Sequence, residues 1–315
     1  MAKKTLLVGE SCKVVGCTKV LVFGSLNIDY VYSVDHFLQK GETQSSKDLQ
    51  VFAGGKGLNQ SVSLAKAGAR VYLAGSIGKD GLFLKEMLEE AGVAIDYIDI
   101  RDDVRSGNAI IQVDKDGHNC ILLYGGANQT TRKEHIDEVL ENFNKGDFLI
   151  LQNEINEMNY LIKQAKKREL LIFLNPSPMN ELINDYPLES IDYLLLNEIE
   201  ASQMIGEELD LSKPDEIVTK LYQKYPYLKI VLTLGSDGSI YKDANQMIHQ
   251  KCYPVDVVDT TAAGDTYTGF FVASIMGGLD LKEAMDMAAK ASSITVSRAG
   301  AAQSIPRWDE VINLG

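Results

Sequence analysis

The segment Val258–Asp265, VDTTAAGD, has the residue types of an anion-binding site joined to a proton acceptor. Small residues ahead of a helix expose backbone N–H groups, and the helix dipole favours an anion there. The apolar run Thr266–Met276 predicts a buried helix directly afterwards. Asp265 could be a plain N-cap, which needs no function. A carboxylate beside a phosphate-sized nest is nevertheless well placed to remove a proton, so the segment favours a general base next to a phosphoryl acceptor.

A second glycine-rich segment, GGKGLNQ from Gly54 to Gln60, opens another predicted helix. Glycines let the backbone approach a ligand closely, and the helix start offers N–H donors. The simpler interpretation is a flexible turn in which Lys56 is a solvated charge. The segment is not a P-loop, because no glycine lies five residues before Gly55 and no Ser or Thr follows Lys56. The dinucleotide-binding fingerprint needs a different glycine spacing after the first strand.

Six short apolar runs predict the strands that must position these segments. The runs are Lys19–Phe23, Arg70–Ala74, Phe148–Leu151, Leu170–Leu174, Tyr193–Leu196 and Lys229–Leu232. They are nearly continuous, as in strands covered on both faces. Helical patterns lie between them, and in the second of these Phe83, Met87 and Leu88 are expected on the buried face. Alternating strands and helices predict a parallel sheet wrapped by helices.

Polar residues follow most of these runs. They are Gly24-Ser25 with Asn27 and Asp29, then Gln152-Asn153-Glu154, Asn175-Pro176, Asn197-Glu198 and Thr233-Leu234-Gly235. Ligands of open α/β sheets bind beyond the carboxyl ends of the strands. Turn chemistry explains any one of these residues, but five groups in register favour a shared site.

Two segments, 29–52 and 107–124, alternate apolar and polar residues with period two, and Asp116-Gly117 is a hairpin turn. They predict a small antiparallel lid that leaves the core in two excursions. We therefore divide the chain into an N-terminal extension (1–18), a core (19–28, 53–106 and 125–315) and the lid. One lid face is expected to carry Val31, Val51, Ile111, Val113 and Ile121, too much apolar surface to remain exposed.

Composition narrows the functional classes. The 315 residues include 31 Lys and Arg against 44 Asp and Glu, a net charge of −13, which argues against a nucleic-acid or anionic-membrane surface. Of the four cysteines only Cys12 and Cys17 are close in sequence, with no further ligand nearby, which favours reduced thiols over a zinc site or a disulfide framework. No signal-peptide core or membrane-length apolar run is present, so a cytoplasmic protein is expected.

The motifs named above, with Asn197-Glu198-Ile199-Glu200, resemble those of the ribokinase-like carbohydrate kinases in order and spacing, from Lys19 to about Trp308. The resemblance implies a three-layer α/β/α fold with a central, mostly parallel sheet and a small antiparallel β lid. It also implies ATP-dependent phosphorylation, and the Gly54–Gln60 segment is most similar to members that phosphorylate the 5-hydroxyl group of D-ribose.

Site residues are carried over from the family position by position. Those implied to hold the sugar are Asn27, Asp29, Gly55, Lys56, Asn59, Glu154 and Asp265. Asp265 is the implied base, and the N–H groups of Ala262, Ala263 and Gly264 are the implied anion hole. Those implied to line the nucleotide are Asn197, Thr233, Gly235, Ser236, Gly238 and Gly264.

The resemblance also implies two cations and a second subunit. Asn197 and Glu200 match the element that organises Mg²⁺, largely through water. The segments that match a monovalent-cation site, expected to take K⁺, contain Asp259, Thr261, Thr295, Arg298, Gly300 and Ser304. The implied partners are ATP, a small neutral sugar and a second copy of the chain, joined through the lid.

Three alternatives remain at this point. The first is a kinase of the same family acting on another sugar or a nucleoside. Three carboxylates around the acceptor, those of Asp29, Glu154 and Asp265, disfavour a phosphorylated sugar. The second is a sugar-binding regulator without catalysis, against which the intact Gly264-Asp265 pair argues. The third is a dehydrogenase, which would need a glycine fingerprint that the first strand lacks.

Overall fold

The structure is a computed structural model that describes residues 18–314, so the predicted extension 1–18 lies outside the described residues apart from Thr18. The strands are β1 (Val20–Phe23), β2 (Asn27–Ser33), β3 (Asp48–Gly54), β4 (Val71–Gly78), β5 (Ala94–Arg101), β6 (Gly107–Val113), β7 (Asn119–Tyr124), β8 (Phe148–Gln152), β9 (Leu171–Asn175), β10 (Tyr193–Asn197), β11 (Lys229–Thr233), β12 (Ser239–Lys242) and β13 (Met247–Gln250). The α-helices are α1 (Lys56–Lys66), α2 (Leu82–Glu90), α3 (Lys133–Leu140), α4 (Met158–Lys167), α5 (Glu198–Ile205), α6 (Pro214–Lys224), α7 (Ala263–Met276), α8 (Leu281–Val296) and α9 (Trp308–Ile312).

A nine-stranded sheet in the order β13-β12-β11-β10-β9-β8-β1-β4-β5 forms the centre of the molecule. All six predicted runs are strands of this sheet, and every neighbouring pair from β11 to β5 is parallel. The hairpin β12–β13 adds an antiparallel edge. The predicted mostly parallel sheet is therefore confirmed.

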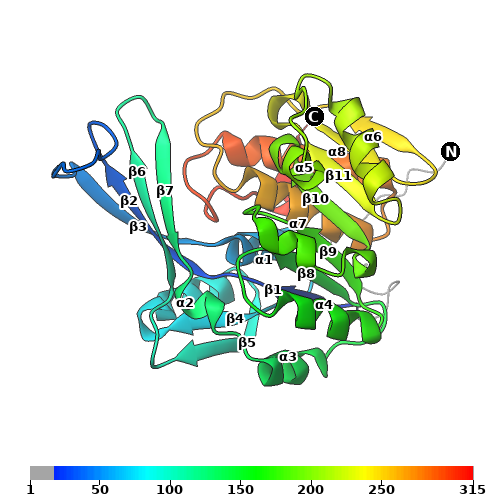
Figure 1. The fold of residues 1–315 in the computed structure, drawn as a ribbon, viewed down its shortest axis with the longest axis horizontal. Helices are drawn as coiled ribbons and strands as arrows, with labels where there is room; N and C mark the ends of the chain where they lie inside the picture. The colour runs from blue at the N-terminus through cyan, green and yellow to red at the C-terminus, as the bar shows by residue number, and fades with distance from the viewer. Residues whose placement is uncertain (1–17, 315) are drawn as a thin grey trace.

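Helices cover both faces of this sheet and complete the predicted three layers (Figure 1). Successive residues of β1 point to opposite faces: Val20 and Val22 pack with α1, α7 and α8, whereas Leu21 and Phe23 pack with α3 to α6. Strands buried on both faces have to be continuously apolar, which explains why they stood out in the sequence. In α2 the buried residues are Leu84 and Leu88, whereas Phe83 is exposed, so the expected position of Phe83 was wrong.

The lid is a separate four-stranded sheet, β3-β2-β6-β7, that projects from the core (Figure 1). Its outer pairs are antiparallel, but the central pair β2–β6 is parallel, so the predicted all-antiparallel lid requires correction. The parallel pair arises because both strands leave the core at the same root, where Asn27 is paired with Gly54 and Gly107.

The register also corrects the predicted apolar face of the lid. Val31 is aligned with Ile111, and Ile111 with Ile121, so these three side chains share a face with Asn27 and Asp29. Val51 is aligned with Tyr30, one residue away along β2, and therefore lies on the opposite face. Apolar side chains are exposed on both faces, most of them on the face of Val51.

Within residues 18–314, no helix has both the length and the apolar character needed to cross a membrane.

Candidate active site

The direction of the chain through the sheet reverses at β1, because β4 and β5 extend the sheet on one side and β8 to β11 on the other. Such a reversal opens a crevice beyond the carboxyl ends of the two adjacent strands. Gly24 directly follows β1 and Gln152 ends β8, so both lie at this point.

The start of α1 packs directly on the chain that leaves β1. The Leu58 N–H donates to the Ser25 carbonyl oxygen at 3.0 Å, and the Gly57 N–H donates to Ser25 Oγ at 3.3 Å. A Cβ atom at Gly57 would lie 2.5 Å from Ser25 N, so the contact requires glycine at this position. The glycine-rich segment is thus closely packed on the chain that follows β1, which argues against the interpretation as a flexible turn.

Glu154 joins this junction to the end of β8. Its Oε2 accepts a hydrogen bond from Ser25 Oγ and another from the Lys56 N–H at 3.1 Å. Burial acts to lower the pKa of the Lys56 ammonium group, but the nearby carboxylates outweigh it and raise that pKa. They belong to Asp265, Glu154 and Glu200. The three carboxylates therefore favour the charged form of Lys56.

Asn27 and Asp29 lie at the root of the lid. Asn128 orients the first of them: its Nδ2 donates to Asn27 Oδ1 at 2.7 Å, and its Oδ1 accepts from the Leu26 N–H at 3.0 Å. Burial raises the pKa of the Asp29 carboxyl group from 3.8 to about 7, and the charge of Glu154 adds to the effect. The free site therefore holds an acid that titrates near neutrality.

Asp265 lies in the first turn of α7, which begins at Ala263 and not at the expected Thr266. It is therefore not the N-cap, a position that Ala262 occupies with a left-handed φ of 61°. The carboxylate accepts hydrogen bonds from Asn59 Nδ2 at 3.0 Å and from Gln60 Nε2 at 2.9 Å. Asn59 Oδ1 is buried and has no hydrogen-bond partner among the described residues, which leaves an acceptor beside Asp265.

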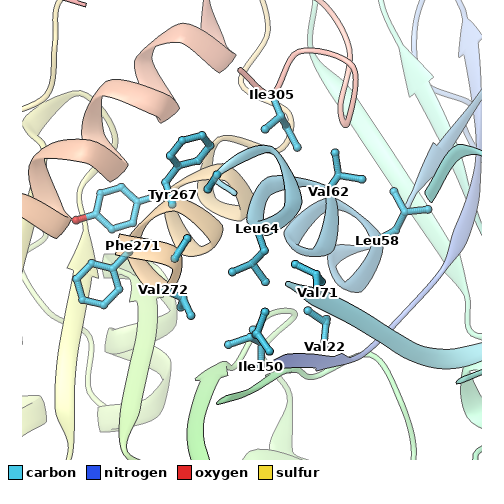
Figure 2. Close-up of a cluster of buried hydrophobic side chains, with 14 of the residues drawn as sticks. Val22, Leu58, Val62, Leu64, Val71, Ile150, Tyr267, Phe271, Val272 and Ile305 are labelled. Carbon is cyan, nitrogen blue, oxygen red and sulfur yellow. The ribbon is translucent and has the colours of Figure 1, made fainter. Parts of the chain in front are cut away.

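The packing of α1 on α7 fixes these contacts. Figure 2 shows α1, which carries Leu58, Val62 and Leu64, next to α7, which carries Phe271 and Val272, with both helices above the strands of the core; Leu64 is the labelled α1 residue nearest to Val272. All five side chains are almost completely buried. Two helices packed in this way cannot slide without opening cavities, so the apolar interface determines the geometry of the polar one.

The predicted nucleotide residues lie at the carboxyl ends of β10 and β11 and in the turn after β11, apart from Gly264, which lies in the first turn of α7. Asn197 and Glu200 form a capping box on α5, in which the Glu200 N–H donates to Asn197 Oδ1 at 2.8 Å and the Asn197 N–H donates to Glu200 Oε2 at 3.0 Å. Both side chains thus have a structural role of their own. Their oxygen atoms are also the ligand type that Mg²⁺ prefers. Thr233 ends β11, and Gly235, Ser236 and Gly238 form the turn that follows.

The segments predicted to hold a monovalent cation meet at Asp259. Its Oδ1 accepts from the Thr261 N–H at 2.9 Å, and its Oδ2 accepts from the Gly300 N–H at 3.0 Å. Three other residues predicted for the cation site form side-chain hydrogen bonds to other partners. Thr295 Oγ1 donates to Thr266 Oγ1, Arg298 donates to Glu310, and Ser304 Oγ donates to the Ala301 carbonyl oxygen. A cation here would have to be held by the backbone oxygen atoms of these segments.

The structure thus places the sugar-site candidates in neighbouring hydrogen-bonded groups, of which the one that contains Asn59 and Gln60 also contains Asp265. A cleft of about 170 Å³ opens beside them at the root of the lid, lined by Asn27, Leu123, Tyr124, Gly125, Asn128, Gln129, Asn153, Glu154 and Pro178. Sequence reasoning missed the roles of Asn128, Gln60 and Gln152. Gln60 and Gln152 stand inside motifs that were noticed, but their contacts join parts of the chain far apart in sequence.

This fold and site define a class of enzyme. The family model described as "pfkB family carbohydrate kinase" matches residues 17–308, and the chain belongs to this family. The predicted family is confirmed, and with it the prediction of a sugar kinase.

Three relatives within this family, one sequence and two solved structures, are similar to the chain over almost its whole length. The ribokinase of Staphylococcus aureus is 34% identical over 299 residues, which cover 93% of this chain and 98% of that protein. The structure of Arabidopsis thaliana ribokinase complexed with ribose and ATP matches with a TM-score of 0.85 and 31% identity, covering 94% of this chain and 98% of that one. Ribokinase from Cryptococcus neoformans, in complex with ADP, matches with a TM-score of 0.82 and 33% identity over the same shares.

Proposed function

We propose that the protein transfers the γ-phosphoryl group of ATP to the 5-hydroxyl group of D-ribose. The observation that carries this proposal is the Asp265 carboxylate, fixed by Asn59 and Gln60 at the N-terminus of α7. The names of the three relatives support ribose as the acceptor.

The sugar would be held where the lid meets the core. Asn27 and Asp29 approach it from the lid, whereas Gly55, Lys56, Asn59 and Glu154 approach it from the core. Amide and carboxylate oxygen atoms in this number suit a neutral polyhydroxylated ligand, since each hydroxyl group needs both a donor and an acceptor. A site built this way also rejects analogues that lack one hydroxyl group, because its own polar atoms would stay unpaired.

Asp265 would take the proton of the attacking hydroxyl group as that oxygen bonds to the γ-phosphorus and the bond to ADP breaks. The N–H groups at the start of α7 would stabilise the charge on the transferred group, because the first turn of a helix has no intrahelical acceptors for them. Ala262 and Gly264 fit this role better than Ala263, whose N–H already donates to the Thr260 carbonyl oxygen at 3.3 Å. Most of the rate would come from positioning and electrostatics.

Two cations would assist the phosphoryl transfer. Mg²⁺ bound with ATP neutralises phosphate charge, and Asn197 and Glu200 would organise it through water. A monovalent cation, which we propose is K⁺, would lie between the segments joined by Asp259, namely those around Thr261, Thr295, Arg298, Gly300 and Ser304. Its charge would strengthen the anion hole from behind. Because ATP is its phosphate donor, we expect the enzyme to act in the cytoplasm.

The decisive experiment is a coupled assay of ADP release with a panel of sugars and nucleosides, using the unmodified protein and Asp265→Asn. We expect D-ribose to give the highest kcat/KM and Asp265→Asn to lower kcat by about 10²–10⁴-fold, with ATP affinity retained. Asp215→Asn is the matched control, since Asp215 lies in the first turn of α6, away from the site. If adenosine or fructose 6-phosphate were preferred, ribose would be the wrong substrate. If Asp265→Asn kept a tenth of kcat, Asp265 would not be the base.

We also propose a homodimer that forms through the lid. Leu122, Tyr124 and Val51 are between 50% and 67% exposed, and all three lie on the lid face opposite Asp29. An isologous contact between two lids would bury this face. Light scattering should give a dimer for the unmodified chain and a monomer for Leu122→Glu. Leu182→Glu is the control: Leu182 is similarly exposed but lies outside the lid, so this variant should remain a dimer. A concentration-independent monomer of the unmodified chain would refute the proposal.

A further inference from the structure

Two buried glutamines form a chain of hydrogen bonds that ends on Asp265. Gln152 Nε2 donates to Gln60 Oε1 at 2.7 Å, and Gln60 Nε2 donates to Asp265 Oδ1 at 2.9 Å. Both glutamine side chains are completely buried, and 8% of Asp265 is exposed. They come from β8 and α1, so the chain of bonds crosses the reversal point of the sheet. Buried polar groups of this kind are costly unless their bonds are made.

The order of these bonds determines which way each amide points. An amide has one acceptor end and one donor end, so Gln60 can offer its NH₂ group to Asp265 only while its oxygen atom faces Gln152. If the Gln60 amide turned over, two oxygen atoms would face each other at the carboxylate, and two donors would face each other at Gln152. Gln152 and Asp265 therefore favour the same orientation of Gln60, although no hydrogen bond is formed between Gln152 and Asp265 themselves.

Gly24 leaves the space that the Gln152 amide occupies. Its Oε1 lies against Gly24, where a Cβ atom would be only 2.1 Å away. Oε1 is buried and has no hydrogen-bond partner among residues 18–314, so the printed hydrogen bond of this amide is the one that its Nε2 donates to Gln60. The glycine after β1 thus provides the space that allows an amide at the end of β8 to reach α1.

We propose that Gln60 and Gln152 are positioning residues that fix the plane of the Asp265 carboxylate for proton transfer. The proposal rests on the proposed function, in which Asp265 is the base. Asn59 holds one carboxylate oxygen and Gln60 the other, so together they determine where the remaining lone pairs point. A displacement of about 1 Å at a reacting group can cost about 10²-fold in rate, which is the scale of effect expected here.

The test uses methionine, which has nearly the shape of glutamine but cannot donate a hydrogen bond. Gln60→Met should lower kcat about 10- to 100-fold while changing KM for ribose and for ATP by less than about threefold. Gln152→Met should lower kcat by a smaller factor. The double variant should be no slower than Gln60→Met alone, because Gln152 acts through Gln60. If Gln60→Met does not fold, Gln152→Met carries the same prediction without touching Asp265.

Two further variants separate positioning from stability. In an Asp265→Asn background, Gln60→Met should cause no further loss of kcat, since there is no longer a base to orient. Ser63→Ala removes another buried bond between α1 and α7, from Ser63 Oγ to the Thr266 carbonyl oxygen. It should lower the melting temperature and leave kcat within about twofold.

The outcomes distinguish the two proposals. If Asp265→Asn retains activity, the base assignment fails. If Asp265→Asn is inactive but Gln60→Met keeps full kcat, or lowers kcat by the same factor in both backgrounds, only the positioning role is refuted.

Discussion

Titration of Asp29 should reduce the stability of the free protein as the pH rises from about 4 to about 7. The pKa of Asp29 is 3.8 in an unfolded chain and about 7 in the folded one, so the folded state holds the proton more tightly. For a carboxyl group with a raised pKa, stability is greatest below the unfolded value, falls through the window between the two, and is level above it. Asp29→Asn removes the titrating group and should remove this loss.

The size of the effect follows from the two pKa values. Their difference corresponds to an upper limit of about 4 kcal/mol at pH 8. Asp29 is only partly buried, so screening by solvent should reduce the gain of Asp29→Asn to about 1–2 kcal/mol. At pH 4.5, where the folded unmodified protein carries a protonated Asp29, the variant should gain only about a quarter as much.

Urea unfolding at pH 4.5, 6 and 8, without ligands, measures this difference. Asp35→Asn is the matched control: it removes the same charge from the same lid, but at an exposed position where a hydrogen bond from Lys47 lowers the pKa of Asp35. It should give no gain at pH 8. If Asp29 holds the sugar as an acceptor, kcat/KM for ribose should also rise through a pKa near 7 and lose this dependence in Asp29→Asn. Equal pH dependence of unfolding in Asp29→Asn and the unmodified protein would refute the reasoning.

Three further results are expected. Ala262→Gly should raise the free energy of unfolding by up to about 1 kcal/mol, because the φ of 61° at Ala262 strains a residue that has a Cβ atom but not glycine. A variant less stable than the unmodified protein would contradict this. Gly57→Ala should lower the free energy of unfolding by about 1–3 kcal/mol, because the new methyl group would lie 2.5 Å from a backbone atom. Gly277→Ala, whose new methyl group would have no neighbour closer than 3.4 Å, is the control and should be nearly neutral; urea unfolding measures both variants. Activity in tetramethylammonium buffer should increase when K⁺ replaces it at constant ionic strength, and equal rates would count against the cation site.

The sequence predicted the central strands well because burial on both faces requires an unbroken apolar run, as in Phe148–Leu151. Strands at the edges were missed. In β5 each of Ile95, Tyr97 and Ile98 stands beside an aspartate, and β12 and β13 are only four residues long. The parallel pairing of β2 with β6 could not be predicted either, because alternation identifies a strand but not its partner.

The sequence predicted which residues belong to the site but not the contacts between them. Local motifs identified Asp265 and Asn59, whereas the start of α7 was placed three residues late because alanine at position 262 is an unusual cap in an unusual conformation. The contact of Gln152 with Gln60 spans 92 positions of sequence. Nothing local to either glutamine indicates it, because it depends on which strand lies next to β1.

Because the lid is formed by two separate segments of the chain, it is difficult to exchange lids between members of this family. The chain crosses between core and lid four times, and three of the crossings, at Asn27, Gly54 and Gly107, meet in a single row of the small sheet. A lid from another family member could therefore be grafted only as two separate inserts, with three of the four splices beside the proposed sugar site. Exchanging the surface that would join two subunits would then disturb substrate choice as well, so the two properties are expected to change together when lids are exchanged.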